Sequence, residues 1–175
     1  MPRHTRTDRY SRVAIWLHWV TAASVLANVA IALAYRPLMG WHKAIGLTVL
    51  VLTVGRLAWR LAHSAPPLPA NVKRWETGVA HAVHWSFYLL LLAMPISGWL
   101  MVSGAEKRRP LNWFGAFDIP YLPVGRAAGA VGHDAHSVLG WLMIALVVLH
   151  IAAALRHHVL LRDRTLVRMA PVLKH

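Results

Sequence analysis

The sequence predicts an all-α integral membrane protein, a bundle of four transmembrane helices with both termini in the cytoplasm. Apolar residues make up 57% of its 175 residues and charged residues only 14%, whereas a soluble domain carries about 25% charged residues. Four apolar stretches each have roughly the 20 residues that a helix needs to cross a bilayer. They are residues 13–35, 42–61, 79–102 and 136–156. We expect residues 1–175 to form a single membrane domain.

The distribution of basic residues predicts the orientation of these helices. With the N-terminus inside, 13 of the 19 lysines and arginines fall in inner segments, and such an excess marks the cytoplasmic side. The inner residues are Arg3, Arg6, Arg9, Arg12, Arg56, Arg60, Lys73, Arg74, Arg156, Arg162, Arg164, Arg168 and Lys174; the outer ones are Arg36, Lys43, Lys107, Arg108, Arg109 and Arg126. We interpret the net charge of +13 as this signal and as an attraction to anionic membrane lipid. We do not interpret it as a nucleic-acid-binding surface.

The first stretch, 13–35, has two interpretations. It follows a basic start and contains Ala32-Leu33-Ala34, which resembles the cleavage site of a signal peptide. Its apolar run, however, exceeds the 7–15 residues of a signal-peptide core. Cleavage would also remove His18, so we expect a retained helix.

Tryptophans near the ends of the other three stretches support their assignment as spanning helices. These residues are Trp41 and Trp59 around 42–61, Trp99 in 79–102 and Trp141 in 136–156. Their amphipathic rings favour the membrane–water interface. Arg56 and Arg60, at the inner end of the second stretch, either neutralise a bound anion or mark the cytoplasmic interface, and we prefer the second interpretation.

Four histidines fall at two depths in these helices. His136 and His150 lie 14 residues apart in the fourth stretch, so they share one face and are about 21 Å apart along the axis. Because successive helices cross in opposite directions, His42 matches the outer depth of His136, and His18 matches the inner depth of His150. Ionisable residues inside spanning helices mark functional sites. Four imidazoles in two pairs predict two haems, one above the other.

Small residues one helical turn after each paired histidine support this prediction. The residues four positions on are Ala22, Gly46, Gly140 and Ala154, and a flat macrocycle lying against a helix needs such a gap. Small residues also allow close helix packing in membranes. Four other histidines lack the full pattern. Trp85, Tyr88 and Leu161 lie four positions after His81, His84 and His157. His133 is followed by the small Ser137, but the residue 14 positions after it is Val147.

The absence of cysteine limits the cofactors and covalent links that the chain can form. It excludes disulfides, iron–sulfur clusters, thiolate-bound haem and covalently attached haem. A haem bound by two histidines has no open iron position, so it transfers single electrons and does not bind a substrate.

With these residues in place, the chain resembles the prokaryotic cytochrome b561 family. The matching strings are YSRVAIWLHW, HKAIGLTVLVLTVGRLAWR, GVAHAVHWSFYLLLLAMPISGW, NWFGAFDIPY and LHIAAALRHHVLLRDRTLVRMAP. The resemblance places the haem-iron ligands at His18, His42, His136 and His150. It implies two b-type haems, a bacterial inner-membrane location and electron exchange with ubiquinone, with superoxide as the outer donor in some members.

Two other functions stay open. Related haem b subunits of hydrogenases and other dehydrogenases share the ligand plan but work beside a catalytic partner, whereas this chain has no obvious docking extension. A membrane protein that transports metal ions through histidines is the second alternative, but it explains neither the paired depths nor the small neighbouring residues.

Two further regions have candidate roles at the membrane surfaces. In the outer loop, Lys107, Arg108 and Arg109 would steer a small anion such as superoxide, or simply keep the loop soluble. Residues 111–121 are expected to lie on the outer interface and to cover the outer haem, or only to anchor the loop. On the inner side, His157 and His81 would line a quinone site and supply protons, or hydrogen-bond at the headgroups.

Overall fold

The computed structural model describes residues 10–63, 66, 74–163 and 165–170. It contains four long helices: α1 (Arg12–Ala34), α2 (Met39–Ala62), α3 (Arg74–Ser103) and α4 (Arg126–Leu155). All four belong to segments that are long and apolar enough to cross a membrane. The predicted fold class, a helical membrane bundle, is therefore confirmed. Six basic residues that predicted the orientation lie outside the described residues: Arg3, Arg6, Arg9, Lys73, Arg164 and Lys174.

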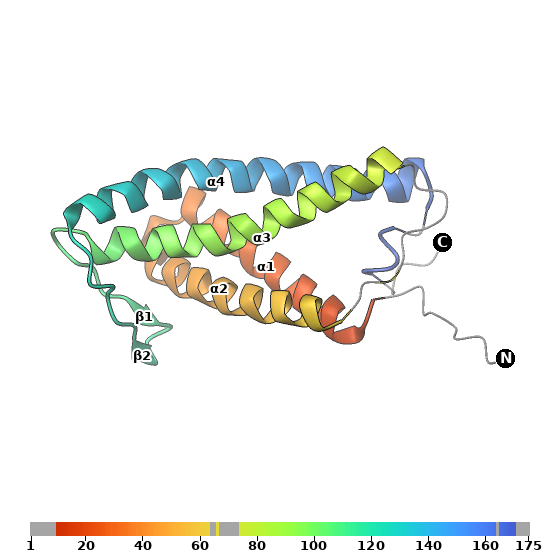
Figure 1. The fold of residues 1–175 in the computed structure, drawn as a ribbon. Coiled ribbons are helices and arrows are strands. Elements are labelled where there is room, and N and C mark those ends of the chain that lie inside the picture. Colours follow the sequence, from red (N-terminus) through yellow and green to blue (C-terminus); the bar gives the residue numbers. More distant parts are fainter. Residues whose placement is uncertain (1–9, 64–65, 67–73, 164, 171–175) are drawn as a thin grey trace.

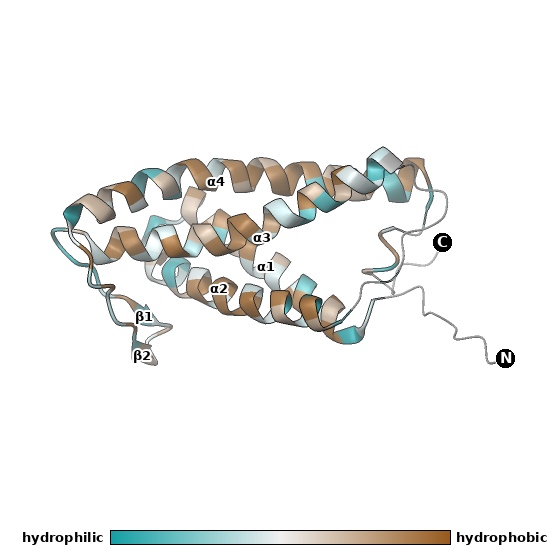
Figure 2. Ribbon diagram, in the orientation of Figure 1, coloured by the Kyte–Doolittle hydropathy of each residue, from teal (hydrophilic) through white to brown (hydrophobic). Residues whose placement is uncertain are grey.

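The helices pack in chain order, α1 on α2, α2 on α3 and α3 on α4 (Figure 1). Apolar residues fill the middle of the helices, and hydrophilic residues gather towards their ends (Figure 2). We keep the names of the predicted topology for the two ends. The inner end holds the start of α1 and the end of α4, and the outer end holds the α1–α2 connection and the α3–α4 loop.

Three helices are longer than the apolar stretches predicted, and α2 exceeds its stretch, 42–61, by the least. The fourth begins at Arg126 instead of residue 136, and the third begins at Arg74 instead of residue 79. Hydropathy marks only the part of a helix that suits hydrocarbon, whereas backbone hydrogen bonds continue the helix into polar surroundings. Close packing holds the extension of α4, because a β-carbon at Gly129 would lie 2.8 Å from the Gly104 backbone.

Short elements complete the fold. A 3-10 turn, η1 (Arg36–Leu38), joins α1 to α2, and a π-helical turn, η2 (Arg156–Leu160), extends α4. In the outer loop, β1 (Asn112–Trp113) and β2 (Phe117–Asp118) form an antiparallel hairpin. The Trp113 indole nitrogen donates to the Thr48 hydroxyl at 3.0 Å, and Phe114 contacts Trp41 edge-on. The outer segment is thus a hairpin against α2.

The buried core lies between α2, α3 and α4. Val49, Leu90, Leu91 and Met143 form it. Met143 is midway along α4 between His136 and His150, so apolar packing separates the two levels of paired histidines.

Candidate functional site

The outer pair joins His42 on α2 to His136 on α4, with 6.1 Å between the ring centroids. The Nδ1 atom of His42 lies 3.1 Å from the Asn28 carbonyl oxygen, and Nδ1 of His136 lies 3.1 Å from that of Met94. A carbonyl oxygen only accepts hydrogen bonds, so each Nδ1 carries the proton and donates it. The lone pair of each Nε2 is then free to bind a metal.

The inner pair joins His18 on α1 to His150 on α4, with 6.3 Å between the ring centroids. Aromatic rings surround it: Trp19 lies beside His18, and Phe87 lies beside His150. The Nδ1 atom of His18 is buried and has no hydrogen-bond partner among the described residues. Such a group in a membrane interior costs free energy unless something binds it.

The spacing of both pairs fits a metal held between two imidazoles. Two metal–nitrogen bonds of about 2 Å, with roughly 1 Å from each nitrogen to its ring centre, require about 6 Å between the centroids. The paired residues also come from α1 and α4 and from α2 and α4, which are not neighbours in the packing order of the bundle. Beside Gly46 and Gly140, a β-carbon would meet only the ends of Asn28 and Met94, each at 3.7 Å. Both pairs therefore have the spacing of a metal bound by two imidazoles, and the two glycines leave room beside the outer pair for a flat group.

Known proteins resemble this chain along nearly its whole length. A sequence profile of prokaryotic cytochrome b561 matches residues 9–171. The chain is 34% identical to cytochrome b561 homolog 2 of Escherichia coli K12, over 93% of this chain and 91% of that protein. It is 32% identical to the probable superoxide oxidase CybB of Yersinia pestis, over 93% and 96%. It is 28% identical to cytochrome b562 of Cereibacter sphaeroides, over 94% and 97%.

The chain belongs to the prokaryotic cytochrome b561 family. The profile covers nearly the whole sequence, so the resemblance found in the sequence is confirmed. Cytochromes of this family are helical membrane proteins that bind haem b and transfer electrons, and these properties define the class of the present protein.

In this cytochrome, α3 carries no histidine of either pair, but its residues contact a histidine of each pair. Its Met94 carbonyl and Ser97 hydroxyl lie 3.1 and 3.2 Å from Nδ1 of His136. Near the inner end, the His84 ring lies 6.1 Å from that of His150. The sequence did not identify these supporting groups. A carbonyl acceptor exists at every residue, so no residue type signals which one is used.

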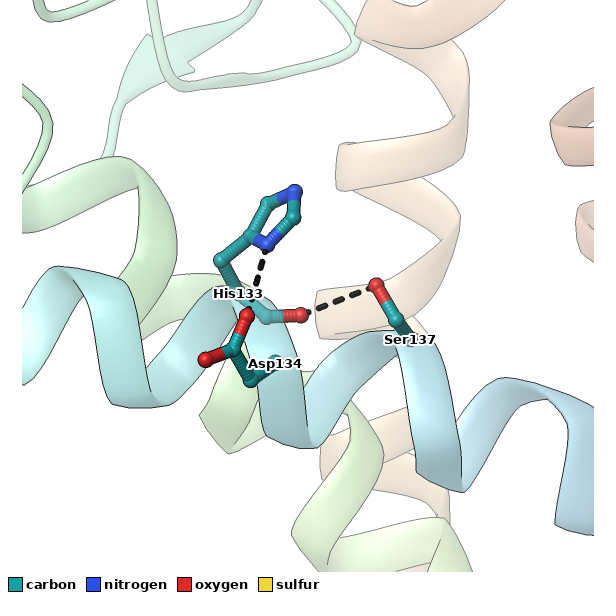
Figure 3. A network of polar contacts seen from close by, with 3 residues as sticks. All are labelled: His133, Asp134 and Ser137. Atoms are coloured by element: carbon teal, nitrogen blue, oxygen red, sulfur yellow. Dashed lines mark hydrogen bonds and ion pairs between the residues drawn. The ribbon is translucent and has the colours of Figure 1, made fainter.

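His133 and His81 stay outside the two pairs. His133 is exposed on α4, where its Nδ1 lies 3.2 Å from Asp134 and its carbonyl accepts from Ser137 (Figure 3). His81 is exposed on α3. Both positions agree with the prediction that these residues are not paired.

His157 is fixed by an acidic residue at the inner end. Its Nδ1 lies 2.5 Å from Asp163 Oδ2, and both side chains are largely buried. Burial alone would raise the pKa of the Asp163 carboxyl, but hydrogen bonds from Thr165 and His157 together lower that pKa below its ordinary value. The described structure therefore ties His157 to the C-terminal segment, whereas a shared site with His81 stays a prediction.

Basic side chains at the outer end have defined contacts. Arg126 pairs with Glu106 at 2.8 Å, with both side chains exposed, and the Arg108 guanidinium lies over the Tyr121 ring. Lys43 donates to the Pro110 carbonyl oxygen. At the inner end, Arg56 lies over the Tyr88 ring of α3.

Proposed function

We propose that this cytochrome binds two b-type haems and carries electrons across the bacterial inner membrane between an outer donor and the quinone pool. His42 and His136 would hold the outer haem iron, and His18 and His150 the inner one. Both termini would face the cytoplasm, in line with the excess of basic residues in the inner segments. The proposal is carried by two imidazole pairs, 6.1 and 6.3 Å between ring centroids, in which a small residue follows each histidine by four positions. The His84 ring has a similar spacing to His150, but Tyr88 follows it instead of a small residue.

A haem held by two imidazoles supplies one-electron chemistry without an open iron position. The protein residues contribute position and exclusion of water. The Asn28 and Met94 carbonyls hold the rings of His42 and His136 by their Nδ1 atoms. Phe87 and Trp19 pack around the inner pair. Such outer contacts fix the tautomer of a histidine ligand and raise its basicity.

Superoxide is the outer donor and ubiquinone the inner acceptor in this proposal, which makes the protein an oxidoreductase. A positive outer surface with Lys107, Arg108 and Arg109 favours a small anion, and one relative is named a probable superoxide oxidase. His157 and His81 are the proposed quinone-site residues. His157→Ala should lower the rate of quinone reduction without changing the haem content. An unchanged rate would remove this residue from the proposal.

A reduced-minus-oxidised visible spectrum of the purified protein, with haem counted per chain, tests the proposal. We expect two low-spin b haems per chain, and one after alanine substitution of any paired histidine. His84→Ala should keep both, because Tyr88 follows His84 where Ala22 follows His18. Colourless protein made with ample haem would overturn the proposal and favour metal transport. A stable co-purifying dehydrogenase would favour the alternative role as a haem b subunit.

A further inference from the structure

Arg56 lies at the depth of the inner pair of histidines. It follows His42 on α2 by 14 residues, and the same interval separates His136 from His150 on α4. Both helices run from the outer end to the inner end, and the rings of His42 and His136 lie 6.1 Å apart between centroids. Fourteen residues rise about 21 Å and return to nearly the same helix face. The face of α2 that carries His42 therefore brings Arg56 to the level of His150.

Contacts with α3 hold the Arg56 guanidinium near the inner pair. Its central carbon lies 5.8 Å from the centre of the Tyr88 ring. Tyr88 follows His84 by one helical turn, and the His84 ring lies 6.1 Å from that of His150. The positive charge of Arg56 acts electrostatically on three imidazoles, those of His18, His84 and His150. A fixed cation thus belongs to the surroundings of both histidines of the inner pair.

The surroundings of the outer pair differ in charge. The side chains that act electrostatically on His136 are those of two other histidines, His42 and His133. Histidine is largely neutral near pH 7, whereas arginine keeps its positive charge. The two levels of the bundle are therefore unequal: a permanent cation acts on the inner pair, and groups that are mostly neutral act on His136.

We propose that Arg56 raises the reduction potential of the inner haem above that of the outer haem, so that electrons pass inwards. This role rests on the proposed function, because it requires a haem in each pair. Oxidised iron carries one positive charge more than reduced iron, so a nearby cation disfavours the oxidised form. Arg56 is half-buried, and apolar surroundings screen its charge less than water does. Inward transfer of one electron oxidises the outer iron and reduces the inner iron, without breaking a bond or moving a proton.

Potentiometric titration of variants with one haem tests the predicted order of potentials. The proposed function expects His42→Ala to keep only the inner haem and His18→Ala to keep only the outer one. We expect the haem of His42→Ala to have the higher potential. This comparison leaves Arg56 itself unchanged, so it does not depend on how well an Arg56 variant folds.

Neutral replacement of Arg56 measures its own contribution. In the His42→Ala background, Arg56→Gln should raise the oxidised-to-reduced ratio of the haem about tenfold at fixed potential, a midpoint lower by about 59 mV. Arg56→Lys keeps the charge and should restore most of the original potential. The matched control is Arg60→Gln, which removes an exposed arginine one turn further along α2. Solvent screens an exposed charge, so the ratio should change less than about twofold in this control.

The site of the effect is checked in the His18→Ala background, where Arg56→Gln should change the ratio of the outer haem less than about twofold. An inner potential equal to or below the outer one would overturn the inference. So would an unchanged inner potential in Arg56→Gln, or equal shifts at both haems. If Arg56→Gln loses the inner haem, the order of potentials in the two single-haem variants decides alone. Absence of haem from the wild-type protein would instead overturn the proposed function.

Discussion

A β-carbon at Gly98 on α3 would lie 3.0 Å from Cε1 of His136 on α4. The imidazole therefore rests directly on a bare stretch of backbone. Met94 and Ser97, on the same helix, contact Nδ1 of this ring. α3 thus sets the position of His136 by close approach as well as by hydrogen bonding.

Gly98→Ala should displace the His136 ring and weaken the outer haem site. Overpacking costs about 1–3 kcal/mol, so haem retention at this site should fall at least about fivefold. The measurement is haem content per chain after dilution into haem-free detergent, with the inner haem retained. Gly55→Ala is the control, since a β-carbon there meets nothing within 4 Å. Equal retention in both variants would contradict the prediction.

Gly132→Ala should destabilise the contact between α3 and α4. A β-carbon at Gly132 would lie 2.7 Å from the Met101 backbone nitrogen and 2.8 Å from the Ser97 carbonyl oxygen. Because backbone cannot rotate away, we expect a loss of about 1–3 kcal/mol and an apparent Tm lower by roughly 3–10 °C. Thermal unfolding in detergent measures this shift. Gly78→Ala, which has open space around the new β-carbon, should not lower the Tm.

Trp19→Phe should loosen the C-terminal segment at the inner end. The Trp19 indole nitrogen donates to the Met169 carbonyl oxygen at 2.7 Å, next to Arg168, which is 7% exposed. Loss of this bond costs about 1 kcal/mol, so trypsin should cleave after Arg168 about fivefold faster. The control is Trp16→Phe, at a position that is 60% exposed. Trypsin should cleave this variant at the wild-type rate. Comparable acceleration in the two variants would show that the hydrogen bond is unimportant.

Asp163→Asn should lower stability at neutral pH but not in acid. Because the folded protein holds the pKa of Asp163 below its ordinary value, the charged carboxylate stabilises the fold above about pH 4. This contribution is lost as the pH falls through the depressed pKa. We expect a deficit of about 1 kcal/mol at pH 7 that shrinks in thermal unfolding curves below pH 4. The control is Asp118→Asn, at an exposed position. A loss of stability in Asp163→Asn that does not depend on pH would exclude the ionised carboxylate as its cause.

Neutralising Lys107, Arg108 and Arg109 together by glutamine should slow reduction of the protein by an anionic donor. Steering by a positive surface accelerates association and weakens with salt. At low salt we expect a rate about threefold to tenfold lower than in the wild type, with a flatter salt dependence. Stopped-flow reduction with superoxide measures this effect, and a neutral donor should react equally with both proteins. Identical rates at low salt would remove these three residues from the proposed donor site.

The sequence was sufficient to predict the features that depend on local pattern. Apolar length predicted four spanning helices, and the depth of each histidine followed from the alternating direction of the helices. The structure indeed brings His18 near His150 and His42 near His136. Their role as haem ligands stays a prediction until the spectrum is measured. The family followed from strings along nearly the whole chain, and the profile match confirmed it.

Hydropathy did not predict the extension of α4 back to Arg126, because helical hydrogen bonding continues beyond the apolar region. Nor did the mixture of aromatic residues in the outer loop predict a hairpin whose Trp113 reaches Thr48 on α2. The hairpin depends on a contact between residues far apart in the sequence, and the extension of α4 is held by the close approach of Gly129 to Gly104.

What the sequence by itself determined is the class of protein: its helices, the levels of its histidines and its family. Only the tertiary structure decided which groups hold those histidines, namely the carbonyls of Asn28 and Met94, and which glycine makes room for His136. The physical reason is that every residue has a backbone carbonyl and every glycine lacks a side chain. The residue type therefore does not show which carbonyl accepts from a histidine or which glycine lies against it. The packing of α1 on α2 and of α3 on α4 selects the ones that lie within reach.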